Sequence, residues 1–230
     1  MIANPDEAII KEYLDFLNNE GFPCIAAKAA LARQQIKCMV AGHIACPNDD
    51  LDILNFIYDF VEAYRASKTL YHSATIIFRA PEDIDEETFD RYMWTRLQAL
   101  ANLDAHNYRY DERVEQDPLS AKFSFSLKSE AFFIIGFHPG NSRLTRQFKY
   151  PVLTFNPHAQ FEQLRDLSKF ENMQKVVRKR DLQYSGSVNP MLDDFGTVSE
   201  VYQYSGRKYD GDWKCPLTIP NAESKHSPTS

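Results

Sequence analysis

The chain has 230 residues and a formal net charge of −6, and 43% of its residues are hydrophobic. This length fits a single domain, and the apolar fraction suffices for a sizeable core. The negative charge argues against nucleic-acid binding, which needs a basic surface. The four cysteines form no C-x-x-C pair. There is no signal-peptide pattern, and apolar runs fall far short of the ~20 residues that span a bilayer, so we expect a cytoplasmic protein with no membrane segment.

The first half of the chain predicts helices and two strands. An amphipathic helix is expected over residues 5–19, where Asn4 can cap the first turn and Pro5 suits its start. The Ala-rich residues 25–32 favour a short helix. Apolar spacing then predicts two long helices and two strands, over residues 48–64, 85–103, 36–44 and 70–78.

The second half begins with a hairpin pattern. Residues 122–127 alternate, a short turn follows, and the continuous apolar run over residues 131–137 is typical of a buried strand. Residues 150–155 predict another strand, and residues 161–177 predict a helix that breaks near Ser168.

Regular patterns fade after residue 183. The sequence therefore predicts one α+β or three-layer domain, with a mixed or antiparallel sheet, packed helices and a loop-rich C-terminal segment. We place this domain over residues 1–216 and expect a disordered tail over residues 217–230.

His138 is the first candidate for chemistry. It ends the apolar run 131–137, and Pro139-Gly140 turns the backbone directly after it. A histidine held at a strand end suits a metal ligand. The alternative is a turn histidine that is hydrogen-bonded to a carbonyl.

Arg143 and Arg146 follow close behind and form a basic patch with Lys149. Guanidinium groups at this spacing suit a clamp for the carboxylates of a cofactor or substrate. The alternative is a solvated loop whose charges pair with Asp or Glu.

His158 and Cys24 are further candidate ligands, since each stands where a helix is expected to begin. A helix N-terminus lowers the pKa of a histidine or a thiol, which favours the neutral imidazole and the thiolate. Lys28 follows one turn after Cys24 and would stabilise a thiolate or bind an anion. The alternatives are a surface histidine and a buried small apolar side chain.

Several segments together resemble the YqcI/YcgG family. They are FPCIAAKAAL (residues 22–31), GFHPGNSRLTRQFKYPVLTFNPHAQFEQLR (residues 136–165), YSGSVNPMLDDFG, YQYSGR and DWKCP. The resemblance covers the chain up to about Pro216. It implies a haem protein that hydroxylates nitrogen, similar to family members that act on guanidino compounds in the guanitoxin and D-cycloserine pathways.

The resemblance implies a haem b site with iron and a set of matching positions. These are Cys24, Lys28, His138, Ser142, Arg143, Arg146, Asn156 and His158. His138 is the first choice for the iron ligand and for catalysis, Cys24 the second and His158 the third. A guanidinium stays charged in water, so a carboxylate is expected against it. The candidates are Asp104, Asp193, Asp194 and Glu200, and Tyr202 and Tyr204 are candidate aromatic walls.

The expected reaction is the N-hydroxylation of arginine or a related guanidino or amino compound. The chain has no G-x-G-x-x-G motif for a flavin or nicotinamide, so an external electron donor or peroxide is implied. Exposed aromatic residues would supply a homodimer interface. A non-catalytic haem-binding or sensing protein is the first alternative. A metal-dependent hydrolase is the second, although His43 and Cys46 lack a companion pair for zinc.

Overall fold

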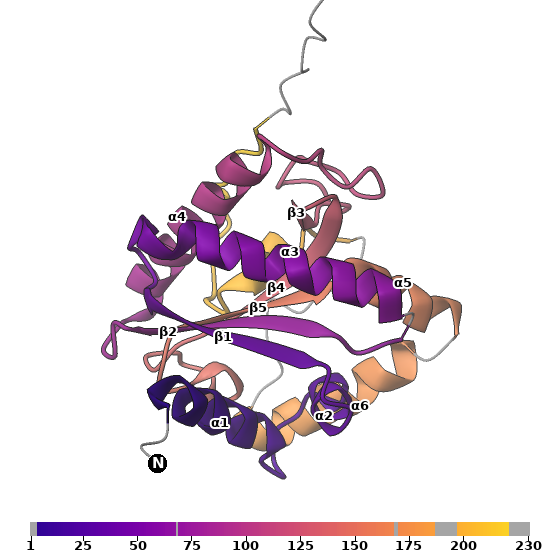
Figure 1. Ribbon diagram of the computed structural model, residues 1–230. Coiled ribbons are helices and arrows are strands. Elements are labelled where there is room, and N and C mark those ends of the chain that lie inside the picture. The colour runs from indigo at the N-terminus through magenta and orange to yellow at the C-terminus, as the bar shows by residue number, and fades with distance from the viewer. Residues whose placement is uncertain (1–3, 68, 168–169, 187–196, 221–230) are drawn as a thin grey trace, which may run out of the picture.

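The computed structural model describes residues 4–67, 69–167, 170–186 and 197–220. These residues form one five-stranded sheet with helices on both faces (Figure 1). In spatial order the strands are β1 (Ile36–His43), β2 (Ser73–Ala80), β5 (Val152–Pro157), β4 (Glu130–Phe137) and β3 (Phe125–Leu127). β1 and β2 are parallel, and the other neighbours are antiparallel. The predicted single α+β domain with a mixed sheet is confirmed.

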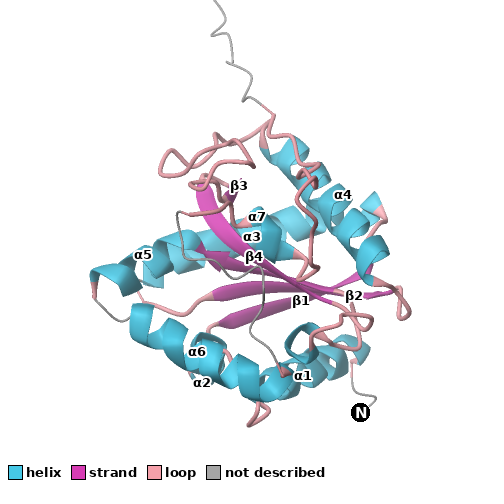
Figure 2. Ribbon diagram, turned by 180° about the vertical axis from the view of Figure 1, so that it is seen from behind, coloured by secondary structure: helices cyan, strands magenta, loops and turns pink. Residues whose placement is uncertain are grey.

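The helices lie in two layers. In chain order they are α1 (Pro5–Asn18), α2 (Ile25–Ala32), α3 (Asp50–Ser67), α4 (Glu86–Asp104), α5 (His158–Asp166), α6 (Phe170–Ser185) and α7 (Val201–Tyr204), with short 3-10 turns η1 (Pro47–Asp49) and η2 (Leu144–Arg146). Figures 1 and 2 show α1, α2 and α6 together on one side of the sheet and α3 on the other.

The sheet has an apolar core on each face, because successive side chains of a strand point to opposite sides. The larger core packs strand residues against α3 and α4, and it includes Ile57, Ile76, Phe89, Leu97, Ile134 and Phe155. The smaller core lies under α1 and includes Tyr13, Leu17, Ile77, Phe137 and Val152. Consecutive residues of β2 (Ile76 and Ile77) thus belong to different cores.

Capping residues fix where the long helices begin. Asn4 Oδ1 accepts the backbone N–H of Asp6 at the start of α1, as the sequence predicts. Asp85 Oδ1 accepts the N–H of Thr88 over 2.7 Å at the start of α4. Both helices also carry acidic residues in their first turns. These negative charges interact favourably with the positive end of the helix dipole.

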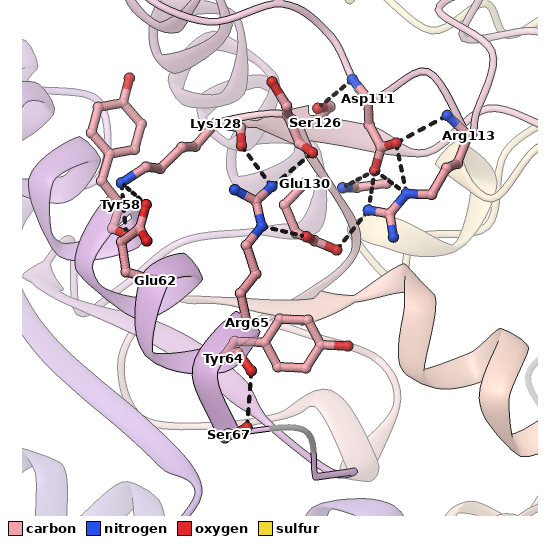
Figure 3. Close-up of polar contacts among 12 residues, drawn as sticks. Tyr58, Glu62, Tyr64, Arg65, Ser67, Asp111, Arg113, Ser126, Lys128 and Glu130 are labelled. Atoms are coloured by element: carbon pink, nitrogen blue, oxygen red, sulfur yellow. Dashed lines mark hydrogen bonds and ion pairs between the residues drawn. The ribbon is translucent and has the colours of Figure 1, made fainter.

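Ion pairs attach the β3–β4 hairpin to α3 (Figure 3). Arg65 Nε of α3 lies 3.2 Å from Glu130 Oε2, and Arg113 Nη2 lies 2.8 Å from Glu130 Oε1. Asp111 binds Arg113 and accepts the backbone N–H of Ala131 over 2.8 Å. Charged residues thus hold the edge of the sheet in register on the face away from α1.

Two strands begin later than predicted. β2 starts at Ser73 because Tyr71 has a φ of +72° and Gln160 Oε1 accepts its N–H, which takes residues 70–72 out of the ladder. β5 starts at Val152 because Pro151 has no N–H to donate.

The C-terminal third differs from the expectations at its end. The helix expected over residues 161–177, with a break near Ser168, is found as two helices, α5 and α6, and Ser168 itself lies outside the described residues. Three residues of the segment predicted as a tail contact the domain: Leu217 is buried, Ile219 packs against the larger core, and Thr218 forms two hydrogen bonds with Gln98. Residues 221–230 of that segment lie outside the described residues.

Candidate functional site

A cavity of about 300 Å³ lies between the sheet and the helices α1, α2, α5 and α6. This size falls in the range of ~300–1,000 Å³ that small-molecule and cofactor pockets occupy. Most of the wall area is apolar, and polar and charged side chains also line it. Five of the predicted site residues line it, namely Cys24, Arg143, Arg146, Asn156 and His158. The fold therefore brings together residues from three separate parts of the chain.

The sheet contributes a polar floor to this cavity. Ser73 and Thr75 of β2 lie beside Thr154 and Asn156 of β5 on the cavity face. Tyr13 of α1 reaches the same face, where its hydroxyl lies 3.0 Å from Thr154 Oγ1, which in turn lies 3.1 Å from Thr75 Oγ1. Alternate polar residues in otherwise apolar strands thus mark the wall of the cavity.

Cys24 stands at the N-cap of α2, where the sequence expects it. Its Sγ accepts the N–H of Ala27 over 3.4 Å. Burial raises the pKa of the thiol and outweighs the bonds from Ala26 and Ala27 and the positive charge of Arg146, which lower it. The prediction of a lowered thiol pKa was therefore wrong, because removal from water disfavours the thiolate more than the helix end favours it.

Arg143 and Asp181 form a buried ion pair at the cavity wall. Arg143 Nη2 lies 2.6 Å from Asp181 Oδ2 of α6, and both side chains are at most 10% exposed. This pair joins the loop after β4 to the helix that covers the cavity. Arg143 is therefore held by a carboxylate and is no surface residue.

Arg146 holds backbone segments together around the same wall. Its guanidinium donates to the carbonyl oxygens of Gly136, Gln203 and Tyr204 over 3.0 to 3.3 Å. Burial, followed by the nearby charge of Arg143, lowers the pKa of Arg146 to about 10. The group still carries its charge at neutral pH, and these three partners are neutral carbonyls.

His158 and Glu200 line the end of the cavity near α5. His158 begins α5, as expected, and its Nδ1 lies 3.8 Å from Glu200 Oε2. Burial is the largest cause that lowers the pKa of His158. Burial raises the pKa of Glu200 to about 8, although bonds from Tyr204 and Ser124 oppose the shift. This end therefore holds a buried imidazole and a buried carboxyl, and burial favours the neutral form of each.

His138 does not line the cavity. It follows Phe137, which does, so the alternation of side chains turns His138 to the opposite face of the sheet. There its ring stacks on Phe89 of α4 with 4.3 Å between centroids, and Nε2 lies 3.0 Å from Asn141 Nδ2. Burial lowers the pKa of His138 to about 4. The ring is packed against an aromatic side chain and does not line the cavity between the sheet and α1, α2, α5 and α6.

The other predicted residues have structural contacts. Lys28 Nζ donates to the carbonyl oxygens of Asn19 and Glu20 after α1. Ser142 binds Glu86 Oε1 at the start of α4 through its N–H and its hydroxyl. Neither lines the cavity. Asn156 does, and its Nδ2 donates to the carbonyl of Phe133 over 3.2 Å.

Glu200 is the one acidic candidate that the structure places at the cavity. Asp104 lies elsewhere, where Tyr58 donates to it over 2.7 Å. Asp193 and Asp194 lie outside the described residues. Tyr202 packs against Trp213 and Tyr204 packs against Trp94, and neither lines the cavity.

The sequence reasoning missed Tyr13 and Asp181. In the sequence, Tyr13 fits the apolar face of its amphipathic helix. The polar role of its hydroxyl is visible only in the structure, where it contacts Thr154. Asp181 sits in a charged helix with no distinguishing pattern. The available signal was the alternation of Ser73 with Thr75 and of Thr154 with Asn156, because polar residues on one face of buried strands need partners or a ligand.

The described residues contain neither a helix that could cross a membrane nor a side-chain cluster that could hold a metal ion. None of their helices combines the length and apolar character needed to cross a bilayer. In this part of the chain, no group of three or more His, Cys, Asp or Glu side chains is arranged to hold a metal ion.

Comparison with known proteins identifies relatives of this chain. A profile of the YqcI/YcgG family matches residues 13–218. The uncharacterized protein YqcI of Bacillus subtilis (strain 168) is 28% identical over 182 residues, which cover 76% of this chain and 70% of YqcI. The uncharacterized protein YcgG of the same organism is 26% identical over 182 residues, covering 76% of this chain and 71% of YcgG. No solved structure matches.

Proposed function

Because this chain belongs to the YqcI/YcgG family, we propose that it is a haem-dependent N-oxygenase of a small guanidino or amino compound such as arginine. The observation that carries the proposal is the meeting of Cys24, Arg143 and Arg146 at one largely apolar cavity. Bound haem would supply the oxidising power that inserts one oxygen atom into an N–H bond. The overall reaction takes O₂, two electrons from an external donor and two protons, and it yields the hydroxylated nitrogen and water.

The residues at the cavity suit an iron porphyrin in kind. A porphyrin needs apolar walls, and Leu17, Phe22 and Ile36 supply them beside Cys24. Thiolate is a common haem ligand in enzymes that activate oxygen. A metal ion deprotonates a thiol that binds to it, so the raised pKa of the Cys24 thiol is no obstacle.

Cys24 is the iron ligand that this geometry favours. His138 faces the other side of the sheet and stacks on Phe89. His158 lies at the cavity, but its ring nitrogens face carboxylates on both sides, with Nε2 3.3 Å from Glu162 Oε1 and Nδ1 3.8 Å from Glu200 Oε2. The thiol of Cys24 lies at a helix N-terminus and near the charge of Arg146, and both of these stabilise a thiolate.

The arginines suit an anionic group in the same cavity. The charge of Arg146 faces backbone carbonyls, so a carboxylate that enters the cavity would gain a full ionic partner. Arg143 is already paired with Asp181. We therefore assign Arg146 as the principal contact for a haem propionate or a substrate carboxylate, with Arg143 as its neighbour.

We assign Glu200 to the cationic end of the substrate. Without substrate this carboxyl keeps its proton, because burial raises its pKa to about 8, and the positive charge of a bound guanidinium would lower that pKa and favour the carboxylate. A guanidinium remains protonated in water, and a buried cavity accepts such a charge only beside an opposite one. Glu200 lines the cavity and is 6% exposed. The four cysteines are free, which supports a reducing compartment and the proposed cytoplasmic location.

A turnover assay tests the proposal. The haem-loaded protein is incubated with arginine, a chemical reductant and O₂, and products are examined by mass spectrometry. We expect a gain of one oxygen atom, dependent on both haem and reductant. Haem uptake with no product from arginine or other guanidines and amines would support the alternative of a non-catalytic haem-binding or sensing protein. Failure to bind haem would exclude both.

A further inference from the structure

Three side chains contact one another in succession between the cavity and the surface of the protein. Glu200 and His158 both line the cavity, His158 lies between Glu200 and Glu162 of α5, and Glu162 is the most exposed of the three. We propose that Glu200, His158 and Glu162 are a proton path between solvent and the cavity. The use of this path rests on the proposed function, whereas its existence does not.

The inner end of the path is fixed. Glu200 Oε1 accepts the hydroxyl of Ser124 over 2.9 Å and also the hydroxyl of Tyr204. These two bonds leave Oε2 directed at His158 Nδ1, 3.8 Å away. This separation exceeds a hydrogen bond, so proton transfer requires a small rotation of either side chain.

The outer end of the path reaches water. His158 Nε2 lies 3.3 Å from Glu162 Oε1, and the side chain of Glu162 is 49% exposed. Arg165 also binds this carboxylate oxygen and holds it toward the ring. An imidazole can accept a proton at one nitrogen and release another from the second nitrogen. The placement of a carboxylate at each nitrogen is the arrangement that such a shuttle needs.

Burial of Glu200 favours a carboxyl that keeps its proton. Burial raises the pKa of Glu200 to about 8, and Arg165 is the charged group that opposes the shift. The buried hydroxyls of Tyr204 and Tyr110 face it and stay protonated. Asp111 is a further acidic group near His158. Glu200 is thus able to hold a proton at neutral pH and to return it to the cavity.

The proposed reaction requires such a path. Reduction of O₂ to one inserted oxygen atom and one water consumes two protons for each turnover, and these protons have to enter a buried site. Electrons come from the external donor, and the path supplies protons alone. Glu200 delivers a proton and is recharged through His158 from Glu162, which equilibrates with water.

Deuterium exchange of the Glu200 carboxyl tests the path directly. Infrared spectroscopy detects the stretch of a protonated carboxyl group, and Glu200→Gln identifies the band of this residue by removing it. The protein as purified is mixed into D₂O, and the shift of the band is followed in time. We expect exchange to slow at least about tenfold in His158→Gln and in Glu162→Gln, because each removes one relay group.

The control is Glu62→Gln, which removes an exposed carboxylate paired with Lys128 and should exchange as the wild type does. Glu162 lies at the surface, so we expect Glu162→Gln to fold. This variant therefore still tests the path if His158→Gln fails to fold. Unchanged exchange in Glu162→Gln, or no Glu200 band at neutral pH, overturns the proposal. Exchange is measured without added haem, so its result does not depend on haem binding. If the protein fails to bind haem, the proposed function is contradicted, and the exchange experiment still decides whether the proton path exists.

Discussion

Arg143 Nη2 lies 2.6 Å from Asp181 Oδ2, and this ion pair joins the loop after β4 to α6. Both residues are buried at the cavity wall. Removal of one partner leaves the other as a buried charge, which costs far more than the loss of an exposed pair. The position of α6 over the cavity therefore depends on this contact.

We predict that Asp181→Ala lowers the free energy of unfolding by ~3 kcal/mol, because Arg143 loses its carboxylate in a buried site. Urea unfolding followed by circular dichroism measures the change. The matched control is Asp15→Ala, which breaks the exposed pair with Lys11 and should cost less than ~0.5 kcal/mol. Equal losses in the two variants would show that the Arg143 pair is solvated and does not hold α6.

The pH dependence of stability should report Glu200. Its pKa is raised in the folded protein from 4.5 to about 8. The folded state therefore keeps a proton that the unfolded chain releases, so this group stabilises the fold fully below pH 4.5 and loses that contribution as pH rises to about 8. We expect Glu200→Gln, which cannot ionise, to gain stability relative to the wild type across this window.

The difference in the free energy of unfolding between Glu200→Gln and the wild type should grow by up to ~1.4 kcal/mol for each unit by which the pH rises in this window. Denaturant unfolding at pH 5 and pH 8 measures it. Glu12→Gln, at an exposed carboxylate beside Lys149, serves as the control and should show no such trend. A constant difference between the two pH values would mean that Glu200 is ionised in the folded protein.

His138 should make the fold sensitive to acid. Burial lowers its pKa from 6.5 to about 4. As pH falls below 6.5, His138 becomes protonated in the unfolded chain but stays neutral in the folded state. Stability is therefore lost between pH 6.5 and 4. We expect His138→Phe, which retains an aromatic ring beside Phe89, to lose less stability than the wild type between pH 7 and pH 5.

Thermal unfolding at these two pH values checks the prediction for His138. His106→Phe is the control because His106 is exposed, and its pH response should match the wild type. If His138→Phe and the wild type lose the same stability on acidification, the imidazole accepts a proton without cost in the folded state.

Much of the fold could be predicted because local signals agree with tertiary packing. Asn4 and Asp85 mark the starts of α1 and α4, and the apolar spacing of these helices gives their buried faces. The four-residue helix α7 could not be predicted, since it is too short for a periodic pattern and depends on packing of Tyr204 against Trp94. The late start of β2 depends on Gln160, which is distant in sequence.

The candidate site could be predicted only in part. Alternation in β4 places Phe137 and His138 on opposite faces, but no local pattern states which face holds a cavity. His138 therefore seemed the best ligand from its position at a strand end, whereas the packing of α4 supplies Phe89 against it. Cys24 and Arg146 meet at the cavity through the docking of α2 beside the sheet, which sequence spacing does not encode.

The absorption spectrum of the haem-reconstituted protein tests the central claim most directly. We compare the wild type with Cys24→Ala, His138→Ala and the control Cys38→Ala, which removes a thiol of β1 that does not line the cavity. We predict a thiolate-ligated spectrum, with a red-shifted Soret band of the ferrous carbon monoxide complex, that Cys24→Ala alone abolishes. Loss of haem binding in His138→Ala with an intact spectrum in Cys24→Ala, or no haem uptake by the wild type, would contradict the account.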